Sequence, residues 1–188
     1  MLRILGISGS LRADSHNTKL LRAAGEILDA SDVEFTIFDG LKAVPPYDED
    51  DDRKPAPAAV AHLRDALAGA DAVFFATPEY NSSIPGVLKN ALDWASRPIA
   101  TNPLRNTPVA VAGASTGMFG AVWAQEELRK VLAAIGARVV QGEVAVGHAQ
   151  TRFDDGGSLT DEQIREQLEA LVSALVDEAL LSTQAAAA

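Results

Sequence analysis

Hydroxyl, amide and guanidinium side chains gather in one short stretch near the start of the chain. From Gly6 to Asn17 the sequence reads Gly-Ile-Ser-Gly-Ser-Leu-Arg-Ala-Asp-Ser-His-Asn, with an apolar run before it and apolar residues at helical spacing after it. A strand, a small-residue loop and a helix start bring free backbone N–H groups and the positive helix end together. Hydroxyls add donors, and an arginine adds a forked set of donors for oxyanions. The stretch therefore predicts a phosphate-binding loop.

The spacing excludes the two best-known nucleotide loops. A dinucleotide fingerprint needs Gly-x-Gly-x-x-Gly, but Ser8 and Leu11 occupy the second and third glycine positions. A Walker A loop needs a glycine five residues after the first one, and neither Gly6 nor Gly9 has it. The chain has no cysteine, which excludes a cysteine-dependent phosphatase. Two interpretations stay open: a hydroxyl-rich loop that binds a phosphomonoester, as in FMN-binding domains, and an ordinary capped strand-to-helix turn.

Composition restricts the class of protein. A length of 188 residues with 47% hydrophobic content suffices for one compact domain with a real core. The formal net charge of −10 argues against a partner that is a nucleic acid. No apolar run is long enough to cross a bilayer, and the N-terminus lacks the layout of a signal peptide. Together with the absence of cysteine, these features predict a cytoplasmic protein without a membrane partner.

Strand and helix patterns alternate along the chain. The expected strands cover residues 2–7, 33–38, 72–76, 108–114 and 137–146, and the later helices cover 58–69, 85–96, 121–135 and 161–181, the last capped by Thr160. Parallel strands need helical crossovers, so this order predicts an α/β fold with a doubly wound, five-stranded parallel sheet and helices on both faces. We expect the flavodoxin-like strand order 2-1-3-4-5, a single domain over residues 1–184 and a disordered alanine tail over 185–188.

Ligands of such sheets bind beyond the carboxyl ends of the strands, where the winding reverses. The loop after the third strand runs from Thr77 to Gly86 and holds one carboxylate, one aromatic ring and several amides and hydroxyls between two prolines. The loop after the fourth strand, residues 113–120, consists mainly of small residues whose N–H groups can face negative charge. This mixture suits a flat heteroaromatic ring, which needs edge hydrogen bonds and a face to pack on.

Three ordered motifs resemble those of the NAD(P)H-dependent FMN reductase family, which includes quinone, chromate and azo-dye reductases. They are Gly9-Ser10-Leu11-Arg12 with Ser15 and Asn17, then Pro78-Glu79-Tyr80-Asn81, then the run from Pro85 to Trp94. Ser115-Thr116-Gly117 and Leu128-Arg129 follow in the family's positions, so the resemblance covers roughly residues 2–150. Three motifs in the right order are far more specific than any one of them.

The resemblance implies a flavoprotein oxidoreductase that holds FMN and takes hydride from NAD(P)H. It assigns the phosphate to Ser10, Arg12, Ser15 and Asn17, and the isoalloxazine ring to Pro78, Glu79, Tyr80, Asn81 and Ser82, with Ser115 and Gly117 bordering the cofactor. Hydride transfer requires no general acid or base, so we name no catalytic residue and no metal ligand. The implied partners are a small-molecule electron acceptor (a quinone, azo compound, free flavin or chromate) and further copies of the chain in a homodimer or homotetramer.

Two other classes compete with the reductase. A flavodoxin-type electron carrier would bind FMN without oxidising nicotinamide itself, although its ring is usually enclosed by aromatics and this chain is only 5% aromatic. A regulatory module would keep the fold and lose the cofactor. Elsewhere we expect the acidic run at residues 48–52 to be a solvated loop, and Asp93 and Arg97 to form a helical ion pair.

Overall fold

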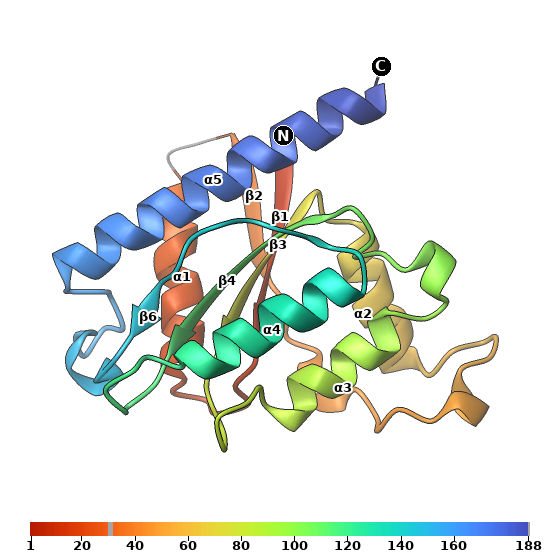
Figure 1. Cartoon of the computed structure of the whole chain (residues 1–188), viewed down its shortest axis with the longest axis horizontal. Helices are drawn as coiled ribbons and strands as arrows, with labels where there is room; N and C mark the ends of the chain where they lie inside the picture. The colour runs from red at the N-terminus through yellow and green to blue at the C-terminus, as the bar shows by residue number, and fades with distance from the viewer. Residues whose placement is uncertain (30–31, 188) are drawn as a thin grey trace.

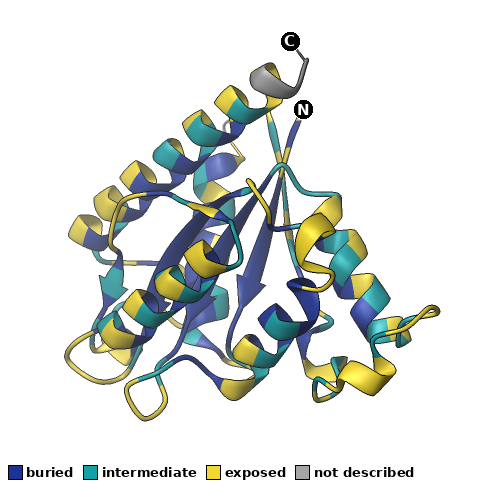
Figure 2. Cartoon of the chain, turned by 45° about the vertical axis from the view of Figure 1, so that its right-hand side comes forward, coloured by how far each residue is buried: buried dark blue, intermediate teal, exposed yellow. Residues whose placement is uncertain are grey.

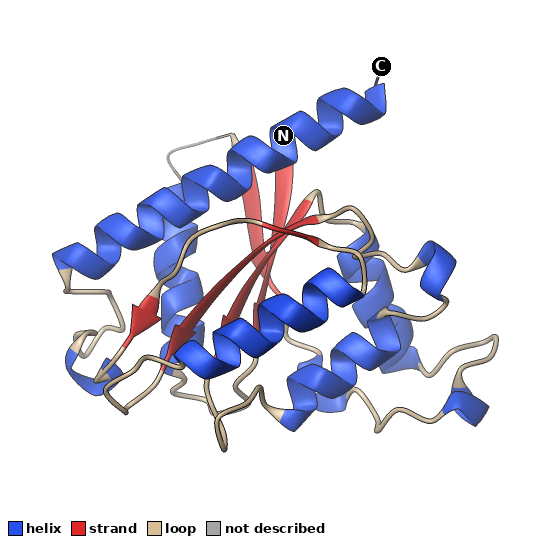
Figure 3. Ribbon diagram, in the orientation of Figure 1, coloured by secondary structure: helices blue, strands red, loops and turns tan. Residues whose placement is uncertain are grey.

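The computed structural model describes residues 1–29 and 32–187, which form short 3₁₀ turns, α-helices and one parallel sheet (Figures 1 and 3). The strands are β1 (Leu2–Ser8), β2 (Val33–Ile37), β3 (Ala72–Thr77), β4 (Pro108–Ala114), β5 (Arg138–Val139) and β6 (Ala145–Val146). The helices are α1 (His16–Leu28), α2 (Ala58–Ala68), α3 (Gly86–Ala95), α4 (Val122–Ala134) and α5 (Glu162–Ala187).

The sheet has the order β2-β1-β3-β4-β5, and within the described residues its neighbouring strands pair in parallel. The predicted order 2-1-3-4-5 is therefore confirmed. Figure 3 shows the strand arrows pointing toward one edge, where the loops that follow β1, β3 and β4 emerge. That edge contains the reversal of winding at which this class of sheet binds ligands.

The fifth strand position differs from the prediction. Residues 137–146 do not form one strand; β5 and β6 are separate two-residue strands that both pair with β4. Between them the chain leaves the sheet at Gly142, and the guanidinium of Arg129 donates to the carbonyls of Val111 at 2.9 Å and Gly142 at 2.5 Å. The Arg129 side chain thus replaces the missing ladder contacts, and its burial lowers the pKa of its guanidinium.

The core lies on both faces of the sheet. All residues of β3 and β4 are buried, as a central parallel strand requires, and Figure 2 shows them as a dark layer between half-exposed helices. Helices α1 and α5 cover one face, with Leu20, Leu21 and Leu168 fully buried. Helices α2, α3 and α4 cover the other, where Leu88 and Leu128 are fully buried.

Helix α5 differs from the predicted helix at both ends. Asp161, and not Thr160, caps α5, because Oδ1 of Asp161 accepts a hydrogen bond from the backbone N–H of Ile164 at 3.0 Å. The helix continues past the expected end at residue 181 as far as Ala187. Its backbone thus includes three of the four alanines of the expected tail, and residue 188 lies outside the described residues. The division of the chain at residue 184 stays a prediction.

The helical ion pair also has a different partner. Asp93 binds Lys89, one turn earlier in α3, with Nζ 2.7 Å from Oδ1. Arg97 lies beyond the last helical residue, Ala95, so the helical spacing no longer places it over Asp93. In the acidic loop, Asp52 is paired with Arg64 of α2 at 2.9 Å.

Candidate functional site

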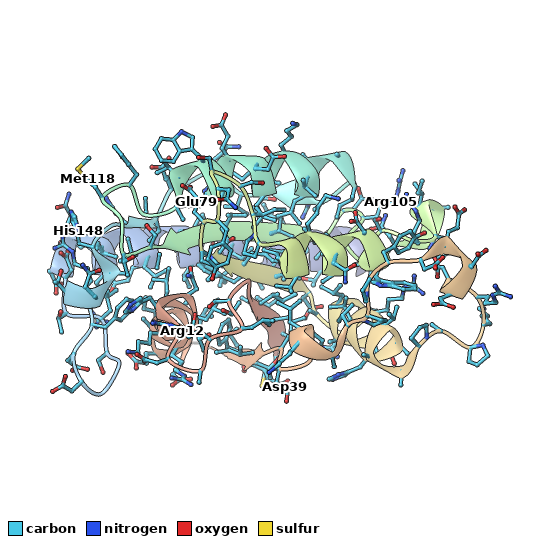
Figure 4. The ribbon with its side chains drawn as sticks, turned by 90° about the horizontal axis from the view of Figure 1, so that it is seen from below. Arg12, Asp39, Glu79, Arg105, Met118 and His148 are labelled. Atoms are coloured by element: carbon cyan, nitrogen blue, oxygen red, sulfur yellow. The ribbon has the colours of Figure 1, made fainter. Side chains whose placement is uncertain are left out.

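Three loops meet at the carboxyl edge of the sheet: the loops after β1, β3 and β4. Figure 4 views the molecule from this side, with Arg12, Glu79 and Met118 on the three loops in turn. Gly9 brings the first two together, because a Cβ at this position would lie 3.0 Å from Leu88 Cδ2 and 3.3 Å from Pro78 Cδ. A side chain here would push the loops apart, so the glycine permits a close approach of the two segments.

Hydroxyl groups organise the loop after β1. Oγ of Ser8 accepts hydrogen bonds from the backbone N–H of Ser10 at 3.3 Å and from the Thr18 hydroxyl at 3.1 Å. Oγ of Ser10 accepts from the backbone N–H of Arg12 at 3.4 Å. The hydroxyl hydrogen of Ser10 remains available to an oxyanion, because accepting this bond does not use it. Within the described residues the Arg12 guanidinium is exposed and makes no ion pair.

The N-terminus of α1 opens beside this loop. Ser15 caps the helix, its Oγ accepting from the backbone N–H of Thr18 at 3.3 Å, and it is almost fully buried. In the part of the chain that the structure describes, the backbone N–H groups of His16 and Asn17 have no acceptor. Two free N–H groups, the helix dipole and the nearby guanidinium form a fitting site for a terminal phosphate.

The side chain of Asn17 performs a different task from the expected one. Its Nδ2 donates to the carbonyl of Ala114 at 2.9 Å, and its Oδ1 accepts from the N–H of Ala114 at 2.9 Å. Asn17 is only 2% exposed. The amide therefore ties the loop after β1 to the end of β4, where the third loop begins, whereas the backbone N–H of Asn17 has no acceptor among the described residues and is free for an anion.

The loop after β3 is a tight hairpin. The backbones of Tyr80 and Ser83 exchange hydrogen bonds of 3.0 and 3.1 Å, and the two residues between them have positive φ, 53° at Asn81 and 59° at Ser82. Left-handed conformations at both central positions are typical of a type I′ turn. The hairpin presents Tyr80 with 57% of its surface exposed, so an aromatic face is available at the rim.

Glu79, in the same loop, points toward α4. Its Oε2 accepts a hydrogen bond from the backbone N–H of Ala124 at 3.1 Å. One carboxylate oxygen is therefore committed to the protein itself. Figure 4 shows the labelled Glu79 beside α4, on the opposite side of the carboxyl edge from Arg12.

The loop after β4 is hydrogen-bonded to β6 and to the residues that follow β6. Ser115 donates its N–H to the carbonyl of Val146 at 3.0 Å, and the carbonyl of Gly117 accepts from His148 at 2.9 Å. A Cβ on Gly147 would lie 2.1 Å from the carbonyl oxygen of Met118, so only glycine fits beneath this loop. The N–H groups of residues 116–119 have no acceptor among the described residues and can face negative charge.

His16 and Asp14 flank the phosphate loop. His16 stacks on Phe153, with ring centroids 5.9 Å apart, and its Nδ1 is buried without a partner in the described structure. Burial, followed by the charges of Arg12 and Lys19, lowers the pKa of His16. Asp14 is exposed and is paired with Lys19 at 2.6 Å, and this contact lowers the pKa of its carboxyl.

Sequence reasoning did not find Gln125. This residue is fully buried in α4, and its Nε2 donates to the carbonyl of Gly120 at 3.1 Å, at the end of the loop after β4. The available signal was a single polar residue on an inward-facing stripe that otherwise contains Ala121, Ala124 and Leu128.

The strand order and the anion site at the start of α1 define a flavodoxin-like nucleotide-binding domain. Residues 2–151 match the family of NADPH-dependent FMN reductases, and the chain belongs to this family. It is 42% identical over 176 residues to the NAD(P)H-dependent FMN reductase of Pseudomonas aeruginosa, covering 93% of each chain. It is 38% identical over 169 residues to the 2-hydroxy-1,4-benzoquinone reductase of a Burkholderia species, covering 89% of this chain and 91% of that one.

A solved structure shows the same relationship. FerB, a flavoenzyme NAD(P)H:(acceptor) oxidoreductase from Paracoccus denitrificans, superposes with a TM-score of 0.83 at 35% identity, covering 95% of this chain and 97% of its own. The predictions of an oxidoreductase, of FMN as cofactor and of NAD(P)H as co-substrate are confirmed at the level of the family. No helix within residues 1–29 and 32–187 combines the length and the hydropathy that a membrane crossing requires.

Proposed function

We propose that this chain is an NAD(P)H oxidoreductase whose preferred electron acceptor is a small quinone. The supporting observation is the pairing of an anion site at the start of a helix with an open rim. The free N–H groups of His16 and Asn17 lie at the start of α1, beside the buried cap Ser15, whereas Tyr80 and the loop after β4 are exposed. An open rim admits a nicotinamide and then a planar acceptor in turn, which a carrier that encloses its flavin does not need. The relative named as a benzoquinone reductase supports the choice of acceptor.

The residues of the three loops divide the work of holding FMN. The phosphate is assigned to the hydroxyls of Ser10 and Ser15, the guanidinium of Arg12 and the backbone N–H groups at the start of α1, with the Asn17 amide bracing the site from behind. The isoalloxazine ring is assigned to the loop after β3, through Pro78, Glu79, Tyr80, Asn81 and Ser82. The loop after β4 borders the cofactor with Ser115 and Gly117.

When bound, FMN supplies the ring chemistry that accepts and donates hydride. The protein contributes orientation and electrostatics. The free N–H groups of residues 116–119 offer fixed dipoles to negative charge, without the reorganisation that water would need. The Tyr80 ring offers a flat apolar surface to an entering substrate. No side chain is assigned a proton-transfer role.

A panel of acceptors tests the proposal. Purified protein reconstituted with FMN is assayed with NADH and with NADPH against benzoquinone, an azo dye, free FMN and chromate. We expect kcat/KM to be highest for the quinone. If the protein consumes NAD(P)H no faster than free FMN does in the same assay, the result would support the electron carrier. A preparation unable to take up FMN would support the regulatory module.

We further propose that the enzyme is cytoplasmic and assembles as a homodimer or homotetramer. Phe119 and Trp123 support self-association, because they are 52% and 46% exposed and pack edge to face with centroids 5.0 Å apart. Exposed aromatic pairs of this kind are frequent at protein interfaces. Light scattering during size-exclusion chromatography measures the assembly directly, and a monomer at micromolar concentration would refute this part.

A further inference from the structure

Helix α4 begins without a cap of its own. The N-cap residue is Ala121, whose φ of 64° and ψ of 33° are left-handed and whose side chain has no acceptor. The first turn contains no acidic residue either. The first N–H groups of a helix need partners from outside it. This need is acute at Ala124, which is 0% exposed and cannot turn to water.

Glu79 supplies the missing cap from a different loop. Its carboxylate accepts the N–H of Ala124, the third helical residue, across 45 positions of sequence. This N–H is the one that a capping side chain normally binds from the N-cap position. The carboxylate also lies where the helix dipole is positive, so its charge is compensated by α4.

Three features hold the end of the loop after β4 in place. Gly120, directly before the cap, has a φ of 59°, and a Cβ there would lie 2.4 Å from the carbonyl carbon of Ala145. Gln125 holds the Gly120 carbonyl from the helix side. Glu79 adds the third restraint, and it is the one that comes from the loop after β3, on the other wall of the site.

We propose that Glu79 is a positioning residue: its carboxylate locks the loop after β3 to the start of α4, and so sets the distance and charge balance between the two walls that face the flavin ring. The location of the ring rests on the function proposed above, but the lock itself is a property of the chain without cofactor. The Glu79 carboxylate acts through Ala124, while the backbone of the same residue remains available to the ring.

The lock is tested first in FMN-free protein by hydrogen exchange. In Glu79→Ala we expect amides of residues 121–125 to exchange at least tenfold faster, because the Ala124 N–H loses its acceptor. In Glu79→Gln the amide oxygen still accepts, and exchange should stay within about threefold of the parent protein. Glu126→Ala, an exposed change on the same helix, is the matched control and should leave exchange unchanged. Equal exchange in Glu79→Ala and the parent protein would overturn the proposal.

The consequence for the cofactor is tested by titration with oxidised and reduced FMN. Glu79→Ala should bind both forms at least tenfold more weakly, and an unchanged affinity despite faster exchange would overturn the role toward the flavin. Glu79→Gln keeps the hydrogen bond and removes a negative charge, so it should favour the reduced, more negative ring by about threefold relative to the oxidised one. A purely structural cap would leave that ratio unchanged, and such a result would also overturn the proposal. If the parent protein binds no FMN, the assignment of the site fails while the exchange result stands.

Discussion

Asn17 joins segments 97 residues apart, and replacing it with alanine gives a stability change that can be worked out from the structure. The substitution removes two hydrogen bonds of 2.9 Å to Ala114. Each bond contributes about 1 kcal/mol net, and its loss costs roughly 2 kcal/mol where the backbone group stays buried and unsatisfied. Ala114 is 2% exposed, so its N–H and carbonyl have little access to water. We expect Asn17→Ala to lower the free energy of unfolding by about 2–4 kcal/mol.

Urea denaturation of the FMN-free protein measures this change without any contribution from cofactor binding. A loss of about 3 kcal/mol corresponds to a fall in Tm of roughly 6–12 °C for a domain of this size. Gln167→Ala, an exposed change on α5, is the control and should stay within about 0.5 kcal/mol. A loss below about 1 kcal/mol in Asn17→Ala would show that the clasp does not form, or that water replaces it, and would refute the reasoning.

Three further substitutions test the site. Arg12→Ala should weaken FMN binding by about 1.5–3 kcal/mol, the scale of a charge-assisted hydrogen bond. A fluorescence titration measures the affinity, with Arg22→Ala on α1 as the control. Unchanged affinity in Arg12→Ala would mean that the phosphate lies elsewhere. Tyr80→Ala should lower kcat/KM or alter acceptor preference by about 2- to 10-fold, the range of one aromatic contact, with little effect on FMN retention; equal losses of FMN and turnover would contradict this role. His16→Phe tests a pH dependence. Burial holds the folded-state pKa of the imidazole below its ordinary value of 6.5, so the neutral imidazole stabilises the fold above pH 6.5, and this stability is lost as the pH falls through the lowered pKa. The phenylalanine variant should therefore lose less stability on acidification than the parent protein, and identical pH profiles of unfolding would exclude the effect.

Local patterns in the sequence were sufficient for the architecture and for the place of the site. The continuous apolar run at β3 predicted a strand covered on both faces. The alternation of strands and helices predicted a parallel sheet, and the phosphate loop after the first strand favoured the order that the structure has. Hydroxyls and one guanidinium between a strand and a helix start marked the anion loop. These signals are readable because each depends on neighbours within one or two turns of the chain.

Only the tertiary structure decided what the individual side chains of the site do. The amide of Asn17 turns to Ala114 and the carboxylate of Glu79 to Ala124, at separations of 97 and 45 residues, and neither pairing leaves a local trace in the sequence. The same holds for Arg129, which fills the gap where the fifth strand position divides into β5 and β6. Buried backbone groups must find partners, and which side chain reaches them depends on how the helices sit against the sheet.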